Sequence, residues 1–501
     1  MVANLATYGA DFWLAPGARS QALAIAAAQL AQAGISNLRV RIDERSLAFT
    51  ALGASVSGRP QVVITTSGTA VANLHPAVLE AHHSGIPLIL LTADRPAELR
   101  GKGANQTTNQ VGIFADAVIA CVDVEAPTDD KLTNLPQQAA KVVSEAMHLA
   151  LANKQPVQLN LQFREPLSAT EPDAVKIYST LAPWEISKTR DEYLAVELSP
   201  KTVVIAGANS DDFLDEISNL NLPVFAEPSS GVRHIQNSIS GYRFALFAKD
   251  ELVEQIEQVI VYGKPTLSRP IISLLRSGVK VYVRPSRMGS FQIPDDVEVI
   301  SNAIAYTGDK SWLDSWQELS NRLTPKETNE LNRRTIVEGA WRLGPDDHLV
   351  LGASQLIREA DHFAPKTAIK VWSNRGLSGI DGTIATATGI ALNTKGKVRV
   401  LLGDLTFLHD VGSLVIDKSD GELDIQLVVV NDHGGKIFSY LEVAGSVEEK
   451  IYNRVFRTGQ DFEIAALAQA FGWQYLLVKD LVEYHSALET TGRVIIEIKL
   501  D

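Results

Sequence analysis

The chain has 501 residues, of which 45% are apolar, and a formal net charge of −13. This length predicts about three domains, and the acidic balance argues against nucleic acid as a partner. The single cysteine, Cys121, excludes an intrachain disulfide and a cysteine-based zinc site, and its apolar neighbours predict a buried core thiol. No apolar run is long enough to span a membrane and the amino terminus lacks a secretory pattern, so we expect a cytoplasmic protein.

The first third of the chain alternates short apolar runs with helical patterns. Strands are predicted at residues 12–15, 39–42, 62–65, 88–92, 118–122 and 157–161, and helices at 21–33, 46–57 and 70–83. This alternation predicts a parallel, doubly wound sheet, in which the loops after the strand carboxyl ends hold ligands. Those loops are rich in small and charged residues, which suits a binding site.

The rest of the chain repeats this pattern twice. A polar stretch punctuated by Pro166, Pro172, Pro183 and Pro200 predicts a linker. Strands follow at 202–206, 223–226, 259–262 and 279–283, then a helical stretch from 310 to about 342, then strands at 368–372, 398–402, 425–430 and 494–498. We therefore predict an α/β protein with two doubly wound domains (1–165 and 346–501), a smaller α/β domain between them (200–310), a linker (166–199) and a helical connector (311–345).

Two strand ends in the last third carry the clearest chemistry. The strand at 398–402 ends in Gly403-Asp404, before a helix predicted from about Asp410. An aspartate there can hold a divalent cation, and the backbone N–H groups of the turn can cradle phosphate. The strand at 425–430 ends in Asn431-Asp432-His433-Gly434-Gly435, which adds oxygen donors and a glycine turn. Oxygen ligands from two adjacent strand ends suit Mg²⁺ bound together with a diphosphate.

These two segments resemble the metal–diphosphate motif of the thiamine-diphosphate enzymes, with Leu405 in place of a glycine and Asn431-Asp432 in place of paired asparagines. If the glycine turn is the anchor, the resemblance implies Asp404, Asp432 and the Gly434 carbonyl as ligands of Mg²⁺ or Mn²⁺. Spacing from Asp404 alone favours Asn431 and His433 instead, and we prefer the first register. Further cofactor contacts are implied for Gly68, Ile380, Gly403, Leu405, Thr406, Gly435, Ile437 and Phe438.

The resemblance also implies a catalytic carboxyl group. Enzymes of this family place a glutamate beside the aminopyrimidine ring of the cofactor, and the match here is Glu44, which opens a predicted helix. A glutamate at a helix start otherwise only complements the helix dipole. In the family the glutamate of one subunit serves the cofactor of another. We therefore expect a homodimer or a dimer of dimers, with sites between a pyrimidine-binding domain (1–165) and the partner's diphosphate-binding domain (346–501).

Other motifs narrow the resemblance. They are Ala15-Pro16-Gly17-Ala18-Arg19-Ser20, Thr66-Ser67-Gly68-Thr69, Ala93-Asp94-Arg95-Pro96, Gly103-Ala104-Asn105-Gln106, Trp372-Ser373-Asn374-Arg375-Gly376 and Ser378-Gly379-Ile380-Asp381-Gly382. Across essentially the whole chain they resemble the 2-succinyl-5-enolpyruvyl-6-hydroxy-3-cyclohexene-1-carboxylate synthase family of menaquinone biosynthesis. These transferases decarboxylate 2-oxoglutarate and add the resulting succinyl carbanion to isochorismate by conjugate addition.

The two substrates bring four carboxylates, which arginine binds by bidentate, charge-assisted hydrogen bonds. The resemblance implies roles in substrate binding and catalysis for Arg19, Arg95, Asn105, Gln106, Arg269, Ser354, Arg358 and Arg375. Arg358 follows Ser354 by one helical turn, so both share a face. Ile380 is the expected apolar wedge that holds the cofactor bent, and Ile437 and Phe438 are expected to wall the pocket.

Two departures and two alternatives accompany this hypothesis. Ala18 replaces the usual serine, and the amino-terminal helix of the family is expected to be short or absent, since about ten residues precede the first strand. One alternative is an acetolactate-synthase-like carboligase, although no dinucleotide fingerprint for FAD is present and small apolar substrates would leave the arginines unexplained. The other is a non-catalytic thiamine-diphosphate-binding relative, against which Glu44 and Asp404 count.

Overall fold

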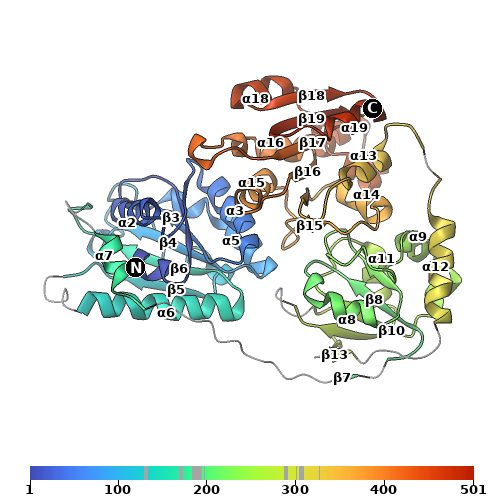
Figure 1. Ribbon diagram of the computed structural model, residues 1–501, viewed down its shortest axis with the longest axis horizontal. Helices are drawn as coiled ribbons and strands as arrows, with labels where there is room; N and C mark the ends of the chain where they lie inside the picture. Colours follow the sequence, from blue (N-terminus) through green and yellow to red (C-terminus); the bar gives the residue numbers. More distant parts are fainter. Residues whose placement is uncertain are drawn as a thin grey trace. The chain divides into compact units, whose positions relative to one another are not determined.

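The computed structural model describes residues 1–128, 134–168, 173–182, 195–196, 198–286, 291–300, 302–303, 310–326 and 328–500 (Figure 1). Two compact units make up the chain. The first contains Met1–Lys188, Ile384–Thr394 and Asp410–Leu423, and the second contains Thr189–Thr383, Lys395–His409 and Asp424–Asp501. In the described parts of the chain, the strands form two six-stranded sheets, one five-stranded sheet and one two-stranded sheet, all with parallel pairing.

The first unit is built on a six-stranded sheet with the order β2-β1-β3-β4-β6-β5. Its strands are β1 (Asp11–Leu14), β2 (Leu38–Val40), β3 (Gln61–Thr65), β4 (Leu88–Asp94), β5 (Ala120–Val124) and β6 (Val157–Gln162). The chain runs from β1 to β2 on one side and then returns to β3 on the other. The loops after β1 and β3 therefore leave the sheet at a topological switch point, where ligands of such folds bind.

Alternate side chains of these strands enter two different cores. Phe12 and Leu14 pack with residues of α2 (Gln21–Gln32) and α6 (Leu135–Asn153). Trp13, between them, packs with residues of α3 (Glu44–Ala54) and α5 (His75–Ser84). Helices on both faces explain why the strands are apolar almost without interruption. The predicted doubly wound sheet is confirmed.

Helix α15 (Thr383–Asn393) crosses α3 through two glycines. A Cβ on Gly53 would lie 2.0 Å from the Thr386 carbonyl oxygen, and a Cβ on Gly389 would lie 2.0 Å from the Thr50 carbonyl oxygen. The two backbones therefore approach more closely than any other residue type would permit. This contact ties a helix of the last third of the sequence to the helix that begins with the candidate glutamate.

The second unit contains a five-stranded sheet with the order β12-β11-β10-β8-β9. Its strands are β8 (Thr202–Ala206), β9 (Val224–Ala226), β10 (Gln258–Tyr262), β11 (Lys280–Arg284) and β12 (Glu298–Val299). Helices α8 (Leu214–Asn219), α9 (Tyr242–Ala248), α11 (Arg269–Leu275) and α12 (Ser311–Leu323) accompany the sheet (Figure 1). Phe225 stacks on Tyr242 and meets Trp316 edge-on, so aromatic rings join sheet and helices. A two-stranded sheet pairs β7 (Ala195–Val196) with β13 (Asn302–Ala303).

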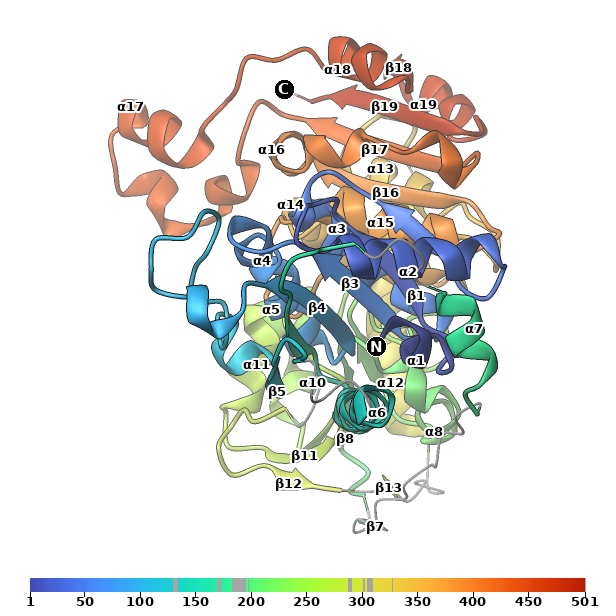
Figure 2. The ribbon, with the colours of Figure 1, turned by 90° about the vertical axis from the view of Figure 1, so that its left-hand side faces the viewer.

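The third sheet, also in the second unit, has the order β15-β14-β16-β17-β19-β18. Its strands are β14 (His348–Leu351), β15 (Lys370–Trp372), β16 (Val398–Gly403), β17 (Ile425–Asn431), β18 (Gln474–Val478) and β19 (Arg493–Lys499); Figure 2 shows β16 to β19 side by side. Residues of α13 (Arg333–Ala340), α14 (Gln355–Phe363) and α19 (Leu481–Ala487) pack on one face. Its switch point lies between β14 and β16, so the loops carrying Ser354 and Asp404 leave there.

Several element boundaries differ from the sequence predictions. The helix predicted at 70–83 is two helices, α4 (Thr69–Ala72) and α5, because Pro76 lies in the first turn of α5 and favours a helix start there. The stretch at 310–342 is likewise α12 and α13, since Pro325 follows α12 and cannot continue it. The helix expected from about Asp410 begins at Asp404 instead, as α16 (Asp404–His409). Strands β14 and β18 were not predicted; β18 is a half-exposed edge strand and lacks the continuous apolar run of a buried strand.

Smaller differences concern single segments. Cys121 is only half-buried, because β5 is an edge strand, and its thiol donates to Gln158 Oε1 at 3.1 Å. Burial raises the pKa of that thiol. The segment predicted as a linker contains α7 (Ala174–Ser179), which packs against the core that contains Phe12 and Leu14. Pro172 and Pro183 of this segment lie outside the described residues. A five-residue helix, α1 (Val2–Ala6), precedes β1.

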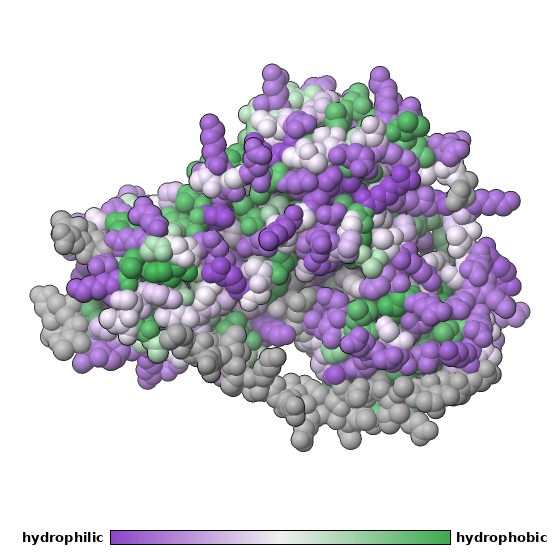
Figure 3. Space-filling model, viewed as in Figure 1, coloured by the Kyte–Doolittle hydropathy of each residue, from purple (hydrophilic) through white to green (hydrophobic). Residues whose placement is uncertain are grey.

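None of the described helices combines the length and apolar character needed to cross a bilayer. On the face seen in Figure 3, hydrophilic residues predominate and hydrophobic ones are scattered. The most exposed large apolar side chains of the described residues are far apart in the sequence: Ile42 lies in the loop before α3, Phe247 on α9 and Val482 on α19.

Candidate functional site

Arg19 lies in the loop after β1, at the switch point of the first sheet. Its backbone N–H donates to Thr66 Oγ1 at 3.3 Å, and its guanidinium donates to the Phe163 carbonyl at 3.2 Å. Arg95 follows β4, and burial together with the nearby charge of Arg19 lowers the pKa of Arg95, against the opposing charge of Asp94. Two guanidinium groups held within each other's field favour an anionic ligand.

A turn at Gln106 completes this loop cluster. The Arg95 guanidinium donates to the Gln106 carbonyl at 2.7 Å and to the Ser67 hydroxyl, while the Gln106 amide donates to the Ser67 carbonyl at 2.9 Å. Gly68 has a φ of 84°, and a Cβ there would lie 3.0 Å from Gln106 Cγ. Gly68, Arg95 and Gln106 thus lie together, whereas Asn105 is exposed beside them.

Glu44 is the first residue of α3. The preceding Asp43 caps this helix by accepting the Arg45 N–H at 2.9 Å. The Glu44 carboxylate is partly exposed and accepts one hydrogen bond, from Asn73 Nδ2 at 3.3 Å. A carboxylate with one long hydrogen bond remains accessible to a ligand that offers a proton.

A buried carboxylate joins the starts of α3 and α15. Asp410 accepts the N–H groups of Ile384 and Ala385 at 2.7 and 3.0 Å, and the Ser413 hydroxyl at 2.8 Å. Its other contact is with the Arg45 guanidinium, at 3.5 Å. From the sequence, Asp410 was predicted only to begin a helix. No local motif marks it as the residue that caps α15, whose Ala385 lies 25 positions earlier.

In the second unit, the candidate metal residues leave the third sheet at one edge. The Asp404 carboxylate accepts the N–H groups of Leu405 at 2.8 Å and Gly434 at 2.7 Å. Burial, and the nearby charge of Asp432, raise the pKa of Asp404 to about 6. Two carboxylates held close together in a buried place favour a hard divalent cation, which would offset their repulsion.

The glycine turn beside these carboxylates has no room for side chains. Gly434 has a φ of 125°, and a Cβ there would lie 2.2 Å from the Arg457 carbonyl oxygen. The Gly435 N–H donates to that same carbonyl at 2.7 Å. Among the described residues, no group of three or more His, Cys, Asp or Glu side chains is placed to hold a metal ion. The candidate donors are the Asp404 and Asp432 carboxylates and the Gly434 carbonyl, which are hard oxygens of the kind that Mg²⁺ prefers.

The two members of the Asn431-Asp432 pair have different partners. The Asn431 amide donates to the buried Glu497 carboxylate at 2.7 Å. Asp432, beside Asp404, accepts a hydrogen bond from the Arg333 guanidinium, and Arg457 donates to the Asp432 carbonyl at 3.3 Å. No motif marked Arg333, which is one of several arginines in the predicted helical connector (311–345).

A cluster of arginines lies near the N-terminal end of α14. The Arg358 guanidinium donates to the carbonyl of Ser354, the residue that caps this helix, at 2.9 Å. Burial lowers the pKa of Arg358, and the charges of Arg375, Arg243 and Arg269 lower it further. Three arginines predicted from the sequence are thus brought together, and Arg243, on α9, is an addition that no motif indicated.

These arginines are held differently. The Arg375 guanidinium is buried and donates to the Thr266 hydroxyl at 2.9 Å and to the Thr266 carbonyl at 3.0 Å. Arg269 is exposed and pairs with Glu442 at 3.2 Å. Among the remaining predicted residues, Gly403 is the last residue of β16, and the others lie in bends or first helical turns after strands: Ile380, Leu405, Thr406, Ile437 and Phe438.

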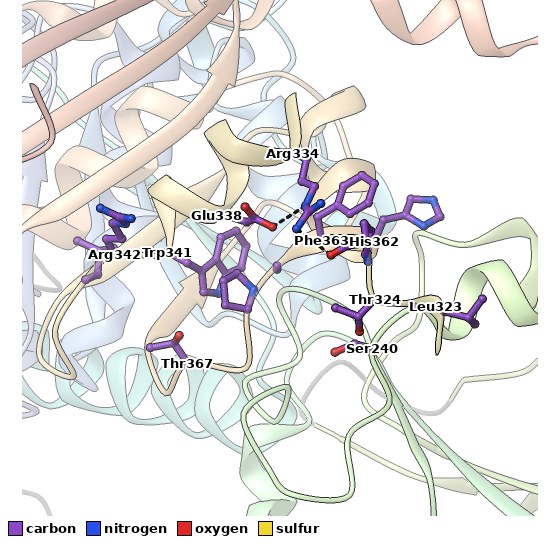
Figure 4. A pocket seen from close by; sticks show the side chains of 15 residues that line it. Ser240, Leu323, Thr324, Arg334, Glu338, Trp341, Arg342, His362, Phe363 and Thr367 are labelled. Atoms are coloured by element: carbon purple, nitrogen blue, oxygen red, sulfur yellow. Dashed lines mark hydrogen bonds and ion pairs between the residues drawn. The ribbon is translucent and has the colours of Figure 1, made fainter. Parts of the chain in front are cut away.

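A cavity of about 550 Å³ lies elsewhere in the second unit (Figure 4). Its wall includes His362 and Phe363 at the end of α14, and Arg334 and Glu338, whose side chains pair at 2.7 Å. The residues that line it include none of the predicted site residues. The predicted chemistry therefore lies at strand ends rather than in this cavity.

Comparison with protein-family models gives two matches. Residues 6–113 match the thiamine pyrophosphate enzyme N-terminal TPP binding domain. Residues 352–498 match the thiamine pyrophosphate enzyme C-terminal TPP binding domain. The two matched segments contain the strand-end loops described above, except the Thr266–Arg269 turn and Arg333.

Curated relatives are similar over nearly the whole chain. The chain is 39% identical to 2-succinyl-5-enolpyruvyl-6-hydroxy-3-cyclohexene-1-carboxylate synthase of Leifsonia xyli subsp. xyli, over 98% of this chain and 93% of the relative. It is 40% identical to the synthase of the same name from Clavibacter michiganensis subsp. michiganensis, with the same coverage. The corresponding protein of Mycobacterium sp. strain JLS is 37% identical over 92% of this chain and 88% of its own length.

Proposed function

The chain belongs to the 2-succinyl-5-enolpyruvyl-6-hydroxy-3-cyclohexene-1-carboxylate synthase family of thiamine-diphosphate-dependent transferases, and on this premise we propose its reaction. It decarboxylates 2-oxoglutarate and joins the remaining succinyl unit to isochorismate by conjugate addition. Carbon dioxide leaves, one carbon–carbon bond forms, and the product is 2-succinyl-5-enolpyruvyl-6-hydroxy-3-cyclohexene-1-carboxylate, an intermediate of menaquinone biosynthesis.

The observation that carries this proposal is the concentration of arginines at strand ends. Arg19 and Arg95 lie within each other's field, as do Arg358, Arg375 and their arginine neighbours. Each substrate is a dicarboxylate, so four carboxylates must be bound and oriented. Bidentate guanidinium–carboxylate pairs fix both charge and direction. A carboligase for small apolar oxoacids would have no use for these arginines.

Asp404, Asp432 and the Gly434 carbonyl are the proposed ligands of Mg²⁺ or Mn²⁺, and diphosphate oxygens would complete the coordination of the cation. Thiamine diphosphate supplies the nucleophilic carbon and the electron sink for decarboxylation. Glu44 is proposed to share a proton with the aminopyrimidine ring nitrogen. Ile380, Ile437 and Phe438 would exclude water from the reacting carbon.

The proposed site is shared between two subunits. Glu44 would come from the pyrimidine-binding domain (1–165) of one protomer and the metal ligands from the diphosphate-binding domain (346–501) of its partner. The family-model matches at residues 6–113 and 352–498 fall inside these two proposed domains. The assembly would be a homodimer or a dimer of dimers.

The test is an assay with purified protein, Mg²⁺ and thiamine diphosphate, in which isochorismate consumption is followed by absorbance. We expect consumption only when 2-oxoglutarate is present, with one carbon dioxide released per isochorismate consumed. Equal turnover with pyruvate would favour an acetolactate-synthase-like activity instead. Tight cofactor binding without any consumption would favour a non-catalytic relative.

A further inference from the structure

Glu227 is a carboxylate that the proposed chemistry does not use. It follows β9 directly, at the carboxyl end of the central sheet, and is 1% exposed. Among the described residues, no lysine, arginine or histidine nitrogen forms an ion pair with it. Burial and the charge of Asp361 raise the pKa of Glu227 to about 7, while the charge of Arg375 opposes this rise. A buried carboxylate is costly unless its oxygens are hydrogen-bonded, so its partners indicate what it stabilises.

Within the described residues, the hydrogen bonds that Glu227 accepts come from one turn. The Thr266 N–H lies 3.1 and 3.3 Å from the two carboxylate oxygens, and the Leu267 N–H lies 2.9 Å from one of them. Two consecutive N–H groups that point at one carboxylate fix the orientation of the peptide between them. Glu227 thus determines where the Thr266 carbonyl and hydroxyl are directed.

The same threonine holds Arg375. The guanidinium Nε donates to the Thr266 hydroxyl, and one terminal nitrogen donates to the Thr266 carbonyl, at 2.9 and 3.0 Å. A continuous path of hydrogen bonds therefore runs from Glu227 through Thr266 to Arg375. The path begins on the central sheet and ends at a strand-end loop of the third sheet, and all its members lie in the second unit.

The turn also leads directly into a second arginine. Ser268 follows Leu267, and α11 begins at Arg269, whose charge is felt by Arg358. A shift of the turn would therefore move the start of this helix as well as the partner of Arg375. The backbone N–H groups of this turn have no equivalent side-chain acceptor besides Glu227 in the described structure.

We propose that Glu227 is a positioning residue for substrate binding, which orients the Arg375 guanidinium through the Thr266 turn. The proposal rests on the proposed function for its substrate and gives the central domain a part in the site. Two nitrogens of the Arg375 guanidinium donate to Thr266, so the turn contributes to the direction of Arg375 and of the carboxylate it would bind.

The kinetic test compares Glu227→Ala and Glu227→Gln with a control, Glu80→Gln, which removes another buried carboxylate, on α5 of the first unit and outside the path from Glu227 to Arg375. For Glu227→Ala we expect KM for one of the two dicarboxylate substrates to rise roughly 10- to 100-fold with a smaller change in kcat, because two N–H groups lose their acceptor. Glu227→Gln retains an acceptor oxygen and should restore most of that loss. Glu80→Gln should change KM less than about twofold.

A double-variant cycle separates positioning from general damage. If Glu227 acts through Arg375, Glu227→Ala should add less than about twofold to KM in an Arg375→Ala background. An equal rise in both backgrounds would overturn the proposal.

A second readout does not depend on the reaction. In Glu227→Ala, amide hydrogen exchange should accelerate in the peptide that contains Thr266 and Leu267 and also in the peptide that contains Arg375, but in neither for Glu80→Gln. Unchanged exchange around Arg375 would contradict the proposal, whatever the effect of the substitution on KM. If the wild-type protein lacks the proposed activity but the exchange result holds, the function assignment fails and the positioning role stands.

Discussion

Asp432 and Asn431 are adjacent in the chain yet face opposite partners. The Asn431 side chain is committed to Glu497, inside the third sheet, whereas Asp432 lies within the field of Asp404. Asn431 is the last residue of β17 and Asp432 begins the turn after it, so the two side chains lie in different surroundings. Of the two registers that spacing left open, the geometry favours Asp432 as the candidate ligand.

At this scale we predict that Asp432→Ala weakens Mn²⁺ binding in the presence of thiamine diphosphate by at least about tenfold, because it removes one of two hard oxygen donors. Manganese bound to the protein can be titrated by its electron paramagnetic resonance signal. Asn431→Ala is the matched variant and should lower stability by about 1–3 kcal/mol, since Glu497 loses a donor, with little effect on the metal. If Asn431→Ala weakened Mn²⁺ binding more than Asp432→Ala did, Asn431 would be the ligand instead.

Glu44 gives a second prediction at the residue scale. Glu44→Gln should keep thiamine diphosphate affinity but lose kcat by roughly 10²- to 10⁴-fold, because only the shared proton is removed. The matched control is Glu251→Gln, since Glu251 opens α10 (Glu251–Glu254) after a capping Asp250, as Glu44 follows Asp43. Cofactor binding by calorimetry and turnover by absorbance separate the two effects. Near-normal kcat in Glu44→Gln would remove Glu44 from the mechanism.

At the scale of elements, the crossing of α3 and α15 holds the helix that begins with Glu44 in place. Gly53 and Gly389 let two backbones touch, and Asp410 caps the start of α15 while contacting Arg45. Neither glycine would be expected from helix propensity alone, since glycine is unfavourable in a helix interior. Close packing is therefore what these positions provide.

We predict that Gly53→Ala destabilises the protein by about 2 kcal/mol or more, although alanine is the better helix former, because its methyl would overlap the rigid Thr386 carbonyl. The change should appear as a lower midpoint of thermal unfolding. Gly412→Ala serves as the control, since the nearest atom to its Cβ would be Asp43 Oδ2 at 3.7 Å, an ordinary contact. A Gly53→Ala protein as stable as the Gly412→Ala protein would mean that the crossing can relax.

The pH dependence of stability belongs to the whole molecule. Glu227 has a pKa of about 7 in the folded state, against 4.5 as its ordinary value. Between pH 4.5 and about pH 7, Glu227 keeps its proton in the folded protein but has lost it in the unfolded chain. The free energy of unfolding therefore falls as pH rises through this window. Glutamine does not titrate, so Glu227→Gln removes this fall in the free energy of unfolding. From pH 5 to pH 8 the stability of the variant relative to wild type should therefore rise by up to about 3 kcal/mol.

Denaturant unfolding of both proteins at the two pH values measures this difference. Buried groups that do not interact with Glu227 titrate alike in both proteins, so their contribution cancels in the comparison, whereas the effect of the Asp361 charge on Glu227 is part of the measured difference. A constant difference between pH 5 and pH 8 would show that Glu227 is already ionised in the folded state at pH 5.

The shared site can also be tested on the whole assembly. Glu44→Gln and Asp404→Ala chains, each inactive alone, should recover about a quarter of wild-type activity when co-expressed with two different tags and allowed to pair at random. Half of the dimers would then be mixed, and each mixed dimer would hold one site with both native residues. If each glutamate served its own chain, mixed dimers would have no intact site and no activity would return.

The sequence by itself determined the cofactor class, the family and the doubly wound layout. These depend on local signals: an apolar strand, the turn after it, and a few residues at fixed spacing in motifs such as Gly403-Asp404 and Ala93-Asp94-Arg95-Pro96. It also gave most strands to within about two residues, because buried strands are nearly all apolar. It missed the half-exposed edge strand β18 and extended helices through the prolines that end or begin them.

Only the tertiary structure decided which side chains face one another. Arg243 joins Arg358 and Arg375, Arg333 meets Asp432, and Glu227 reaches Arg375 through Thr266, all across separations of about 100 residues or more. No window of sequence contains such a pair, because strand order and helix packing bring the residues together after the chain has folded. The motifs therefore indicate the type of chemistry, while the packing of the sheets and helices determines which charged side chains lie near the candidate site.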